Sequence, residues 1–378
     1  MEVLTRNLIL ALAALVAVTW LLRWGREFMR AAGVLWYLAA GAGPVLSRLV
    51  SRIEVLTDRY PCGEEQLPYK TYRPQGGRAT PALVVYHGAS PHGEDHPALD
   101  NLARAMAHMG LTVFIPRLPQ LRKVFIDDSD VEAMGLFYRH VQGHEHVAPG
   151  CISVAGVSFG GGLLLKALLD GRMQELPPQA VLAYGTYCDL ETALRYALTG
   201  TVAGQEETHD DPERWGQVIF FHNYLDQIPG TFEHEIVRQV LDYYVQDRAA
   251  DGDAARDGLP ARERRIVDLI LTPGNAESAA FAEEILKKVR PRLASLSPAH
   301  FYRQITYPIW VLHGRRDRFV PHTEALALKA LLPRQVRLHV SSLYEHRQLG
   351  WGRNLVSTVG EALGLIVFMG RFLRAVEG

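Results

Sequence analysis

The sequence has few cysteines and almost no net charge. Three of its 378 residues are cysteine, and 40 lysines and arginines stand against 41 aspartates and glutamates, for a formal net charge of −1. Without a basic excess, composition gives no support for binding through phosphate neutralisation, so we expect no nucleic-acid partner. Cys62, Cys151 and Cys188 are far apart and lack C-x-x-C spacing, which argues against disulfides or a structural zinc site. Cys151 opens an apolar run and is predicted to be a small buried residue.

The sequence also lacks the patterns that usually hold a cofactor or a metal. The glycines at 160–162 do not have the G-x-G-x-x-G spacing of a dinucleotide site, and no phosphate-binding loop is present. Two histidine-rich stretches, at 92–96 and 140–146, lack the H-E-x-x-H spacing of zinc peptidases. We therefore expect neither a cofactor nor a metal.

The N-terminal region, residues 1–50, is strongly apolar. Leu8–Leu22 contains no charge and is followed by arginines at 23, 26 and 30. The poor placement of small-x-small triplets disfavours a cleaved signal peptide, so we expect an uncleaved membrane anchor with the rest of the chain on the cytoplasmic face. A second apolar stretch, Ala31–Leu46, contains glycines and a proline and either spans or lies on the surface. The alternative is that residues 1–50 form two helices packed on the protein body.

From residue 53 onwards, short β-branched runs alternate with longer amphipathic stretches. This alternation predicts an α/β fold with a mostly parallel central sheet of about eight strands, and the apolar strands predict helices on both faces. The predicted strands are Arg52–Thr57, Tyr69–Arg73, Ala82–His87, Leu111–Pro116, Ile152–Val157, Ala180–Tyr184, Ile309–His313 and Val336–Ser341. The predicted helices are Ala98–His108, Asp130–Val141, Gly161–Asp170, Glu324–Leu332 and Val356–Val376.

The alternation stops between about Leu190 and Thr306, where the chain has a helical pattern without a convincing strand. We interpret residues 191–306 as a helical cap inserted into a core made of residues 51–190 and 307–378. Aromatic residues at helical spacing give the cap apolar faces, so we expect it to form much of a substrate pocket. They include Trp215, Phe220, Phe221, Tyr224, Tyr243 and Tyr244.

The segment Gly156-Val157-Ser158-Phe159-Gly160 lies between a predicted strand and a predicted helix. A serine on a sharp strand-to-helix turn projects its hydroxyl above the sheet edge, and the flanking glycines permit the strained backbone. The pattern predicts a nucleophile elbow with Ser158 as the nucleophile.

A His-Gly turn, His87-Gly88-Ala89-Ser90, follows the strand Ala82–His87. The backbone N–H groups of Ala89 and Phe159 are the predicted donors to a tetrahedral oxyanion. We interpret His87 as a structural residue that fixes this turn.

Two further residues complete a catalytic pattern downstream. Asp317 follows the strand Ile309–His313, and His346 lies in the loop before the last helix. The order Ser158, Asp317, His346 is the chain order expected when a nucleophile elbow is followed by an orienting acid and a base. Asp189 is the alternative acid, although Tyr187-Cys188-Asp189-Leu190 is also typical of a helix N-cap.

These motifs resemble the α/β-hydrolase superfamily over residues 60–375, about five sixths of the chain. The second glycine after the elbow, Gly161, is most similar to the dienelactone-hydrolase and prolyl-oligopeptidase branches. The chain departs from dienelactone hydrolases in having Ser158 where they use cysteine, and in its longer insertion at 190–306. The resemblance implies a serine hydrolase with Ser158, Asp317 and His346 in the roles given above.

The sequence as a whole favours a membrane-associated serine hydrolase that cleaves a small, lipophilic carboxylic ester through an acyl-enzyme. The alternatives are a peptidase of related fold and a catalytically silent, membrane-tethered binding scaffold. Acyl-chain length and oligomeric state do not follow from the sequence.

Overall fold

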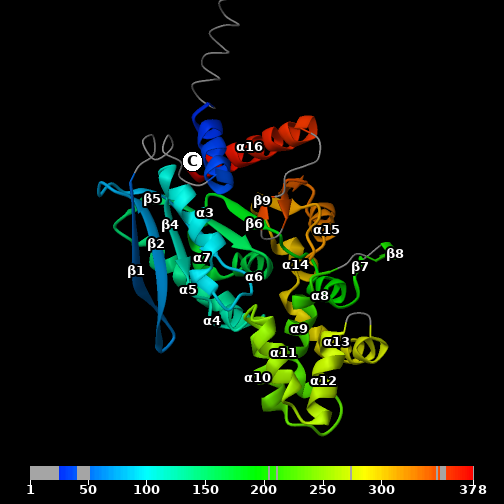
Figure 1. The fold of residues 1–378 in the computed structure, drawn as a ribbon. Coiled ribbons are helices and arrows are strands. Elements are labelled where there is room, and N and C mark those ends of the chain that lie inside the picture. The colour runs from blue at the N-terminus through cyan, green and yellow to red at the C-terminus, as the bar shows by residue number, and fades with distance from the viewer. Residues whose placement is uncertain are drawn as a thin grey trace, which may run out of the picture.

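The computed structural model describes residues 25–40, 52–202, 205–209, 212–272, 275–345, 348–349 and 355–377 (Figure 1). Residues 25–40 form the first described helix. The strands are β1 Ile53–Cys62, β2 Glu65–Pro74, β3 Thr80–Tyr86, β4 Thr112–Pro116, β5 Val147–Val157, β6 Val181–Tyr184, β7 Thr201–Val202, β8 Gln205–His209, β9 Ile309–Gly314, β10 Val336–Ser341, β11 Tyr344–Glu345 and β12 Gln348–Leu349. The α-helices are α3 Pro97–His108, α4 Pro119–Arg122, α5 Asp128–Gln142, α6 Phe159–Ala167, α7 Gly171–Glu175, α8 Leu190–Thr199, α9 Arg214–Asn223, α10 His234–Val245, α11 Ala249–Asp257, α12 Ala261–Leu271, α13 Ala276–Leu296, α14 Pro298–Phe301, α15 Thr323–Leu331 and α16 Leu355–Glu377. Single 3₁₀ turns are η1 Gly93–Asp95, η2 Leu225–Gln227 and η3 Tyr302–Gln304.

Eight strands form the central sheet in the order β1-β2-β4-β3-β5-β6-β9-β10. Strand β2 is antiparallel to both of its neighbours, β1 and β4. All the remaining neighbouring strands in the sheet are parallel to each other. The prediction of a mostly parallel sheet of about eight strands is confirmed. Because the parallel strands all end at one edge, the loops that follow β3, β5, β6, β9 and β10 meet there.

Both faces of the sheet are covered, as the apolar strands predicted. In β3, Ala82, Val84 and Tyr86 belong to one buried cluster, while the intervening Leu83 and Val85 belong to another. Such alternation follows from the two-residue period of a strand. The first cluster joins the sheet to α5, α6 and the inserted helices, and the second joins it to α3, α16 and the helix of residues 25–40.

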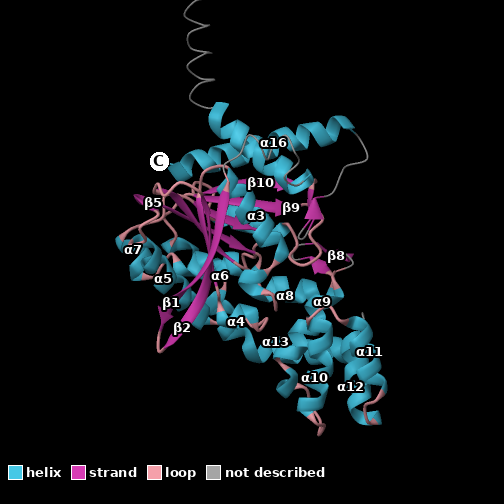
Figure 2. Cartoon of the chain, turned by 60° about the vertical axis from the view of Figure 1, so that its left-hand side comes forward, coloured by secondary structure: helices cyan, strands magenta, loops and turns pink. Residues whose placement is uncertain are grey.

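The segment between β6 and β9 is mainly helical and forms a lobe beyond the sheet, with α10, α11 and α12 at its far end (Figures 1 and 2). Its apolar faces pack on one another through residues such as Phe220, Phe221 and Leu241, which are fully buried. The sequence pattern missed one feature of this segment, a two-stranded sheet of β7 and β8. Strand β8 has the sequence QEETH, which shows no apolar alternation that would indicate a strand.

Cys151 corrects a smaller prediction. It is partly buried rather than buried, because it lies in an irregular stretch of β5, between the residues Val147 and Ile152 that pair with β3. Cys62, Cys151 and Cys188 are all free thiols, and Cys188 alone of the three is buried.

The predicted membrane-associated localisation is wrong for the part of the chain that the structure describes. No described helix combines the length and the apolar character that crossing a bilayer requires. Residues 25–40, which include residues 31–40 of the second apolar stretch, instead pack on the protein through Ala31, Val34 and Tyr37. The predicted anchor, Leu8–Leu22, lies outside the described residues.

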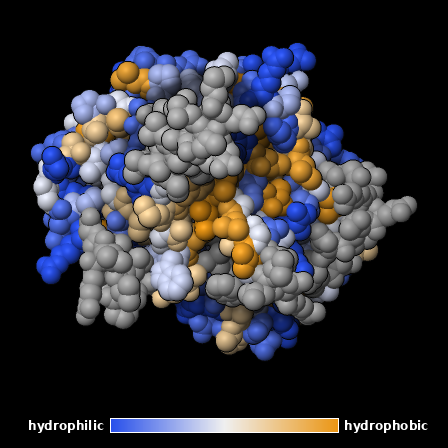
Figure 3. Space-filling model, turned by 90° about the horizontal axis from the view of Figure 1, so that it is seen from above, coloured by the Kyte–Doolittle hydropathy of each residue, from blue (hydrophilic) through white to orange (hydrophobic). Residues whose placement is uncertain are grey.

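The helix of residues 25–40 and α16 form an outer layer over the second buried cluster. Figure 3 looks down on this layer and shows apolar side chains at its surface. Met29 and Trp36 on the first helix and Val359 and Leu363 on α16 are among the exposed apolar residues. The inward faces of both helices are also apolar and are buried, so each helix has one apolar face that packs on the protein and exposed apolar residues on its outer face.

Candidate active site

Ser158 lies in a strained turn between β5 and α6. Its backbone has φ 54° and ψ −129°, a conformation that residues other than glycine rarely adopt. Its N–H donates to the carbonyl of Tyr184 on the neighbouring strand β6 over 2.7 Å. The surrounding structure therefore holds the strained residue in place, as the predicted elbow requires.

The glycines around Ser158 are there because neighbouring backbone and side chains approach closely. A Cβ atom at Gly156 would lie 2.6 Å from Cα of Gly161, and one at Gly160 would lie 2.2 Å from the carbonyl oxygen of His87. A Cβ atom at Gly162 would lie 2.2 Å from the ring of Tyr187. No larger residue fits at these positions without displacing the elbow.

The His-Gly turn packs directly against the elbow. Strands β3 and β5 are neighbours, with Tyr86 paired to Gly156, and a Cβ atom at Gly88 would lie 2.8 Å from Cβ of Ser158. The predicted turn and the predicted nucleophile, which are 70 positions apart in the sequence, are thus in contact.

The ring of His87 is an internal support of this turn. Its Nε2 accepts a hydrogen bond from the N–H of Leu118 (3.0 Å), so Nδ1 carries the proton and donates to the carbonyl of Gly88 (2.8 Å). Burial lowers the pKa of His87 to about 4, which keeps the ring neutral near pH 7.

The two predicted oxyanion donors lie on either side of this contact. Ala89 follows Gly88 in the turn, and Phe159 follows Ser158 at the first position of α6. Across the described ranges, no hydrogen bond takes up the backbone N–H of either residue. Both residues line the same cavity as Ser158.

A buried carboxylate holds the loop that follows the turn. Glu94 accepts from Arg117 (2.7 Å) and from Arg122 (2.8 Å), and Arg122 also donates to the carbonyl of His92 (3.0 Å). The N–H of Ser90 donates to the carbonyl of Leu121. The turn with Ala89 is therefore fixed at both ends, by His87 and by this ion-pair cluster.

Asp317 is buried in the loop after β9, at the same sheet edge as the elbow. Its Oδ1 accepts from the N–H groups of Phe319 (2.9 Å) and Val320 (3.0 Å). Nε2 of His313, which donates to the carbonyl of Val320, lies 3.5 Å from Oδ2 of Asp317. The carboxylate is thus held rigidly two strands away from Ser158.

His346 lies outside the described residues, but the chain that leads to it is described. Ser341, the last residue of β10, pairs with Gly314 of β9, so β10 ends beside the loop of Asp317. The N–H of Ser342 then donates to the carboxylate of Glu361 on α16 over 3.2 Å. His346 is four positions further along the chain.

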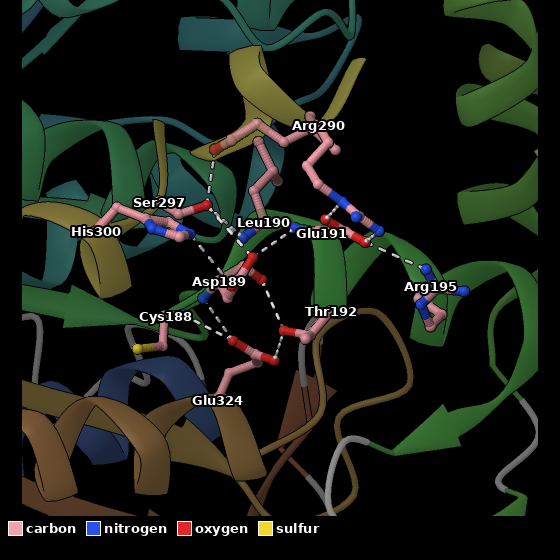
Figure 4. A network of polar contacts seen from close by, with 11 residues as sticks. Cys188, Asp189, Leu190, Glu191, Thr192, Arg195, Arg290, Ser297, His300 and Glu324 are labelled. Atoms are coloured by element: carbon pink, nitrogen blue, oxygen red, sulfur yellow. Dashed lines mark hydrogen bonds and ion pairs between the residues drawn. The ribbon is translucent and has the colours of Figure 1, made fainter. Parts of the chain in front are cut away.

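Asp189, the alternative acid, caps a helix. Its Oδ1 accepts from the N–H of Glu191 at the beginning of α8 over 2.9 Å, which is the N-cap geometry that its sequence context indicated. Figure 4 shows its carboxylate facing Ser297, which precedes α14, and His300 within α14. The side chain is engaged at the junction between β6 and the inserted helices.

Glu324 is a residue that the sequence did not single out. Its buried carboxylate accepts from the N–H groups of Cys188 and Asp189, each over 2.9 Å, and from the hydroxyl of Thr192 (Figure 4). Burial raises the pKa of Glu324 above its ordinary value. A glutamate in the first turn of a helix is ordinarily solvated, so no local signal in the sequence marks it as the link between α15 and the chain entering α8.

Two cavities flank the elbow. The larger, about 170 Å³, contains Ser158 and lies on the sheet face covered by α3, α16 and residues 25–40. The smaller, about 40 Å³, lies on the side of the inserted helices. Ala89, Phe159, Trp215 and Phe319 line both.

The cap supplies less of the main cavity than the sequence predicted. Of the six aromatic residues named for the cap, Trp215 lines the larger cavity, and Trp215, Phe220 and Tyr224 line the smaller one. Most of the larger cavity is formed by the sheet and by helices outside the inserted segment.

No family model matches this sequence, and no curated protein matches it either. Among solved structures, the chain is similar to an acylaminoacyl peptidase from Pyrococcus horikoshii, with 14% identity and a TM-score of 0.48 over 88% of this chain and 43% of that one. It is similar to a 2,6-dihydroxy-pseudo-oxynicotine hydrolase (16% identity, TM-score 0.46, 85% of this chain and 68% of that one) and a puromycin hydrolase (13%, 0.49, 85% and 40%). This chain spans less than half the length of the peptidase.

At these identities and TM-scores the likenesses carry no argument about activity. The resemblance to the α/β-hydrolase superfamily that the sequence motifs indicated is confirmed as far as the fold, on the sheet order and the strained elbow.

Proposed function

We propose that the protein is a serine hydrolase that cleaves a carboxylic ester through an acyl-enzyme. The observation that carries this proposal is the strained Ser158, which lies in contact with the His-Gly turn and lines an apolar cavity. Backbone strain at a buried serine between a strand and a helix is difficult to explain by stability alone, since it destabilises the fold.

In the proposed reaction, Oγ of Ser158 attacks the ester carbonyl carbon while His346 takes the hydroxyl proton. The carbonyl oxygen becomes an oxyanion that the N–H groups of Ala89 and Phe159 stabilise, and Asp317 orients His346. When the intermediate collapses, the carbon–oxygen bond to the alcohol breaks and the alcohol leaves with the proton. A water molecule, deprotonated by His346, then attacks the acyl carbon; the bond to Oγ of Ser158 breaks, the acid leaves, and His346 returns the proton to Oγ.

The apolar cavity favours an ester over a peptide. Burying a peptide segment leaves its N–H and C=O groups without partners unless the site supplies them, and each such group carries a penalty. Residues such as Leu83, Val85 and Leu182 offer no such partners inside the cavity. A peptidase remains the second candidate because of the Gly160-Gly161 pair after the elbow.

A fluorophosphonate probe tests the proposal, because it reacts with an activated serine. We expect purified protein to be labelled, Ser158→Ala to abolish labelling, and His346→Ala to slow it by about a thousandfold. Ser295→Ala, which removes an exposed serine hydroxyl on α13, is the matched control and should be labelled like the native chain.

The substrates decide between the candidates. Hydrolysis of p-nitrophenyl esters with no release from the matching peptide p-nitroanilides supports an esterase, and the reverse result supports a peptidase. Folded native protein that resists labelling contradicts both and favours a silent binding scaffold.

A further inference from the structure

The larger cavity lies on an unexpected side of the molecule. Its floor consists of inward-facing residues of neighbouring parallel strands, including Leu83, Ala155, Leu182 and Leu312, which belong to the second buried cluster. Its walls come from α3, α16 and the helix of residues 25–40. The inserted helices lie on the other side of the sheet edge and contribute little to it.

The cavity begins at the nucleophile and runs back along the strands. Ser158 lines its mouth, and Ala155, three positions earlier on β5, lines its floor. At a rise of about 3.3 Å per residue, these positions are about 10 Å apart. With C–C bonds of about 1.5 Å in a zigzag, that depth accommodates an extended chain of roughly six to eight carbons.

The chemistry of the lining suits a hydrocarbon chain. Among the described residues that line the cavity, none is an aspartate, glutamate, lysine or arginine. Its polar side chains belong to the turn, the loop and the elbow at one end (His87, Ser90, His96 and Ser158) and to two aromatic residues (Tyr184 and Trp215). An apolar cavity of about 150 Å³ in another protein stays dry and binds benzene, which has six carbons. The larger cavity here, about 170 Å³, therefore has room for an apolar group of at least that size.

The helix of residues 25–40 closes this cavity from outside. Leu35 and Leu38 line it, and the helix is seated closely, since a Cβ atom at Gly33 would lie 2.9 Å from Cε of Met109. At the other wall, a Cβ atom at Gly370 of α16 would lie 3.0 Å from the ring of Phe28. The helix and α16 are thus packed on each other over the cavity.

We propose that this cavity is the acyl-chain site and takes a straight acyl chain of about six to eight carbons, with the helix of residues 25–40 as its outer wall. The inference rests on the proposed function, because the acyl carbon is the atom that bonds to Oγ of Ser158. Ser158 lines this cavity and does not line the smaller one beside the cap. The acyl chain therefore begins where the larger cavity begins.

The first measurement is the dependence of kcat/KM on acyl length for p-nitrophenyl esters from acetate to dodecanoate. Each buried methylene is worth about fourfold in affinity, so we expect octanoate to exceed acetate by at least tenfold. Dodecanoate should gain nothing further, because the cavity ends.

Two variants with the same substitution test which cavity is used. Leu182 on β6 lines the larger cavity and Leu194 on α8 lines the smaller one, and both are 7% exposed. Leu182→Phe fills the space of at least two methylenes, so the octanoate-to-acetate ratio should fall at least about tenfold. Leu194→Phe should leave that ratio within about twofold. Thermal denaturation checks that both variants fold, and Leu35→Phe replaces Leu182→Phe if the latter does not.

The relative labelling rates of ethyl and octyl fluorophosphonates test the cavity independently of any ester substrate. Octyl should label the native protein faster, and Leu182→Phe should remove the advantage.

Several results would overturn the inference while leaving the proposed function standing. One is a rate that falls steadily from acetate to octanoate, and another is a ratio that Leu194→Phe changes as much as Leu182→Phe. A third is a selective loss of octyl acetate hydrolysis in Leu182→Phe, which would assign the cavity to the alcohol. A native protein that neither hydrolyses esters nor reacts with either phosphonate overturns the proposed function, and the acyl-chain site with it.

Discussion

The neutral ring of His87 joins the turn after β3 to the chain that enters α4. It is fully buried, donates to the carbonyl of Gly88 and accepts from the N–H of Leu118. Protonation would place a second proton on Nε2, where it faces the N–H of Leu118 and cannot be accommodated. The charge state of this residue is therefore coupled to the position of the turn that carries Ala89.

This coupling predicts acid sensitivity. The pKa of His87 falls from an ordinary value of 6.5 to about 4 on folding, so the folded state binds fewer protons than the unfolded state between these values. Neutral His87 therefore adds up to about 3 kcal/mol to the free energy of unfolding. This stabilisation is fully present above pH 6.5 and is lost as the pH falls towards 4. Urea unfolding at pH 7 and pH 4.5 should show a smaller difference in His87→Gln than in native protein.

The comparison isolates His87, although His140, His144 and His339 also have pKa values lowered by burial. These residues contribute equally to both proteins. An identical loss of stability on acidification in native protein and in His87→Gln would contradict the assignment.

The strained backbone of Ser158 should lower the stability of the protein, so a residue that relieves the strain should raise stability while removing the hydroxyl. Glycine adopts positive φ without strain, so Ser158→Gly should raise the free energy of unfolding above that of Ser158→Ala by about 1 kcal/mol. Neither variant retains the hydroxyl, so both should be inactive. Equal stability of the two variants in urea unfolding would show that the turn is not strained.

At the scale of elements, the elbow depends on how closely α6 approaches the turn after β3. A Cβ atom at Gly160 would lie 2.2 Å from the carbonyl oxygen of His87, a rigid backbone atom. Gly160→Ala should therefore separate the two elements, lower the free energy of unfolding by about 3 kcal/mol and abolish labelling of Ser158 by a fluorophosphonate. Fluorophosphonate labelling and urea unfolding measure both effects.

Gly171→Ala is the control for this substitution. Gly171 is at the first position of α7, and a Cβ atom there meets nothing within 4 Å. Alanine is the better helix former, so this variant should be at least as stable as the native chain and fully labelled. If Gly160→Ala behaved in the same way, the close approach of turn and helix would not be required.

The elements whose residues alternate or repeat regularly were predictable from sequence. Each of the eight predicted strands belongs to the central sheet. The order of the strands in the sheet was not predictable, because it depends on crossover connections that the sequence does not specify. Strand β8 was missed because QEETH is polar throughout. The positions of the elbow and of Asp317 at one sheet edge follow from parallel strands, whereas the role of Glu324 depends on contacts over more than 130 positions.

At the scale of the whole molecule, the sequence left open whether the apolar stretch after residue 31 faces a membrane or the protein, for a physical reason. An apolar helical face has the same sequence whether it faces lipid or protein, because both are apolar surroundings. Its partner, α16, is more than 300 positions away in the chain. Only the assembled sheet, with α3 and α16 upon it, shows that residues 25–40 cover the larger cavity.

Glu377, at the end of α16, forms ion pairs with two arginines of the first described helix, Arg26 and Arg30. Arg30, whose side chain is 9% exposed, donates to the carboxylate of Glu377, which is 22% exposed and 347 positions later. Removing one member of such a pair leaves the other charge buried, so Glu377→Ala should lower the free energy of unfolding by about 2 kcal/mol. It should also reduce the octanoate-to-acetate ratio, since the outer wall of the larger cavity loses its attachment.

Glu175→Ala is the control. It breaks an ion pair with Arg139 in which the side chains of Glu175 and Arg139 are 65% and 59% exposed, and it should change the free energy of unfolding by less than about 0.5 kcal/mol with no change in the ratio. A Glu377→Ala variant that matches Glu175→Ala in urea unfolding and in chain-length profile would contradict the view that residues 25–40 form the outer wall of the larger cavity.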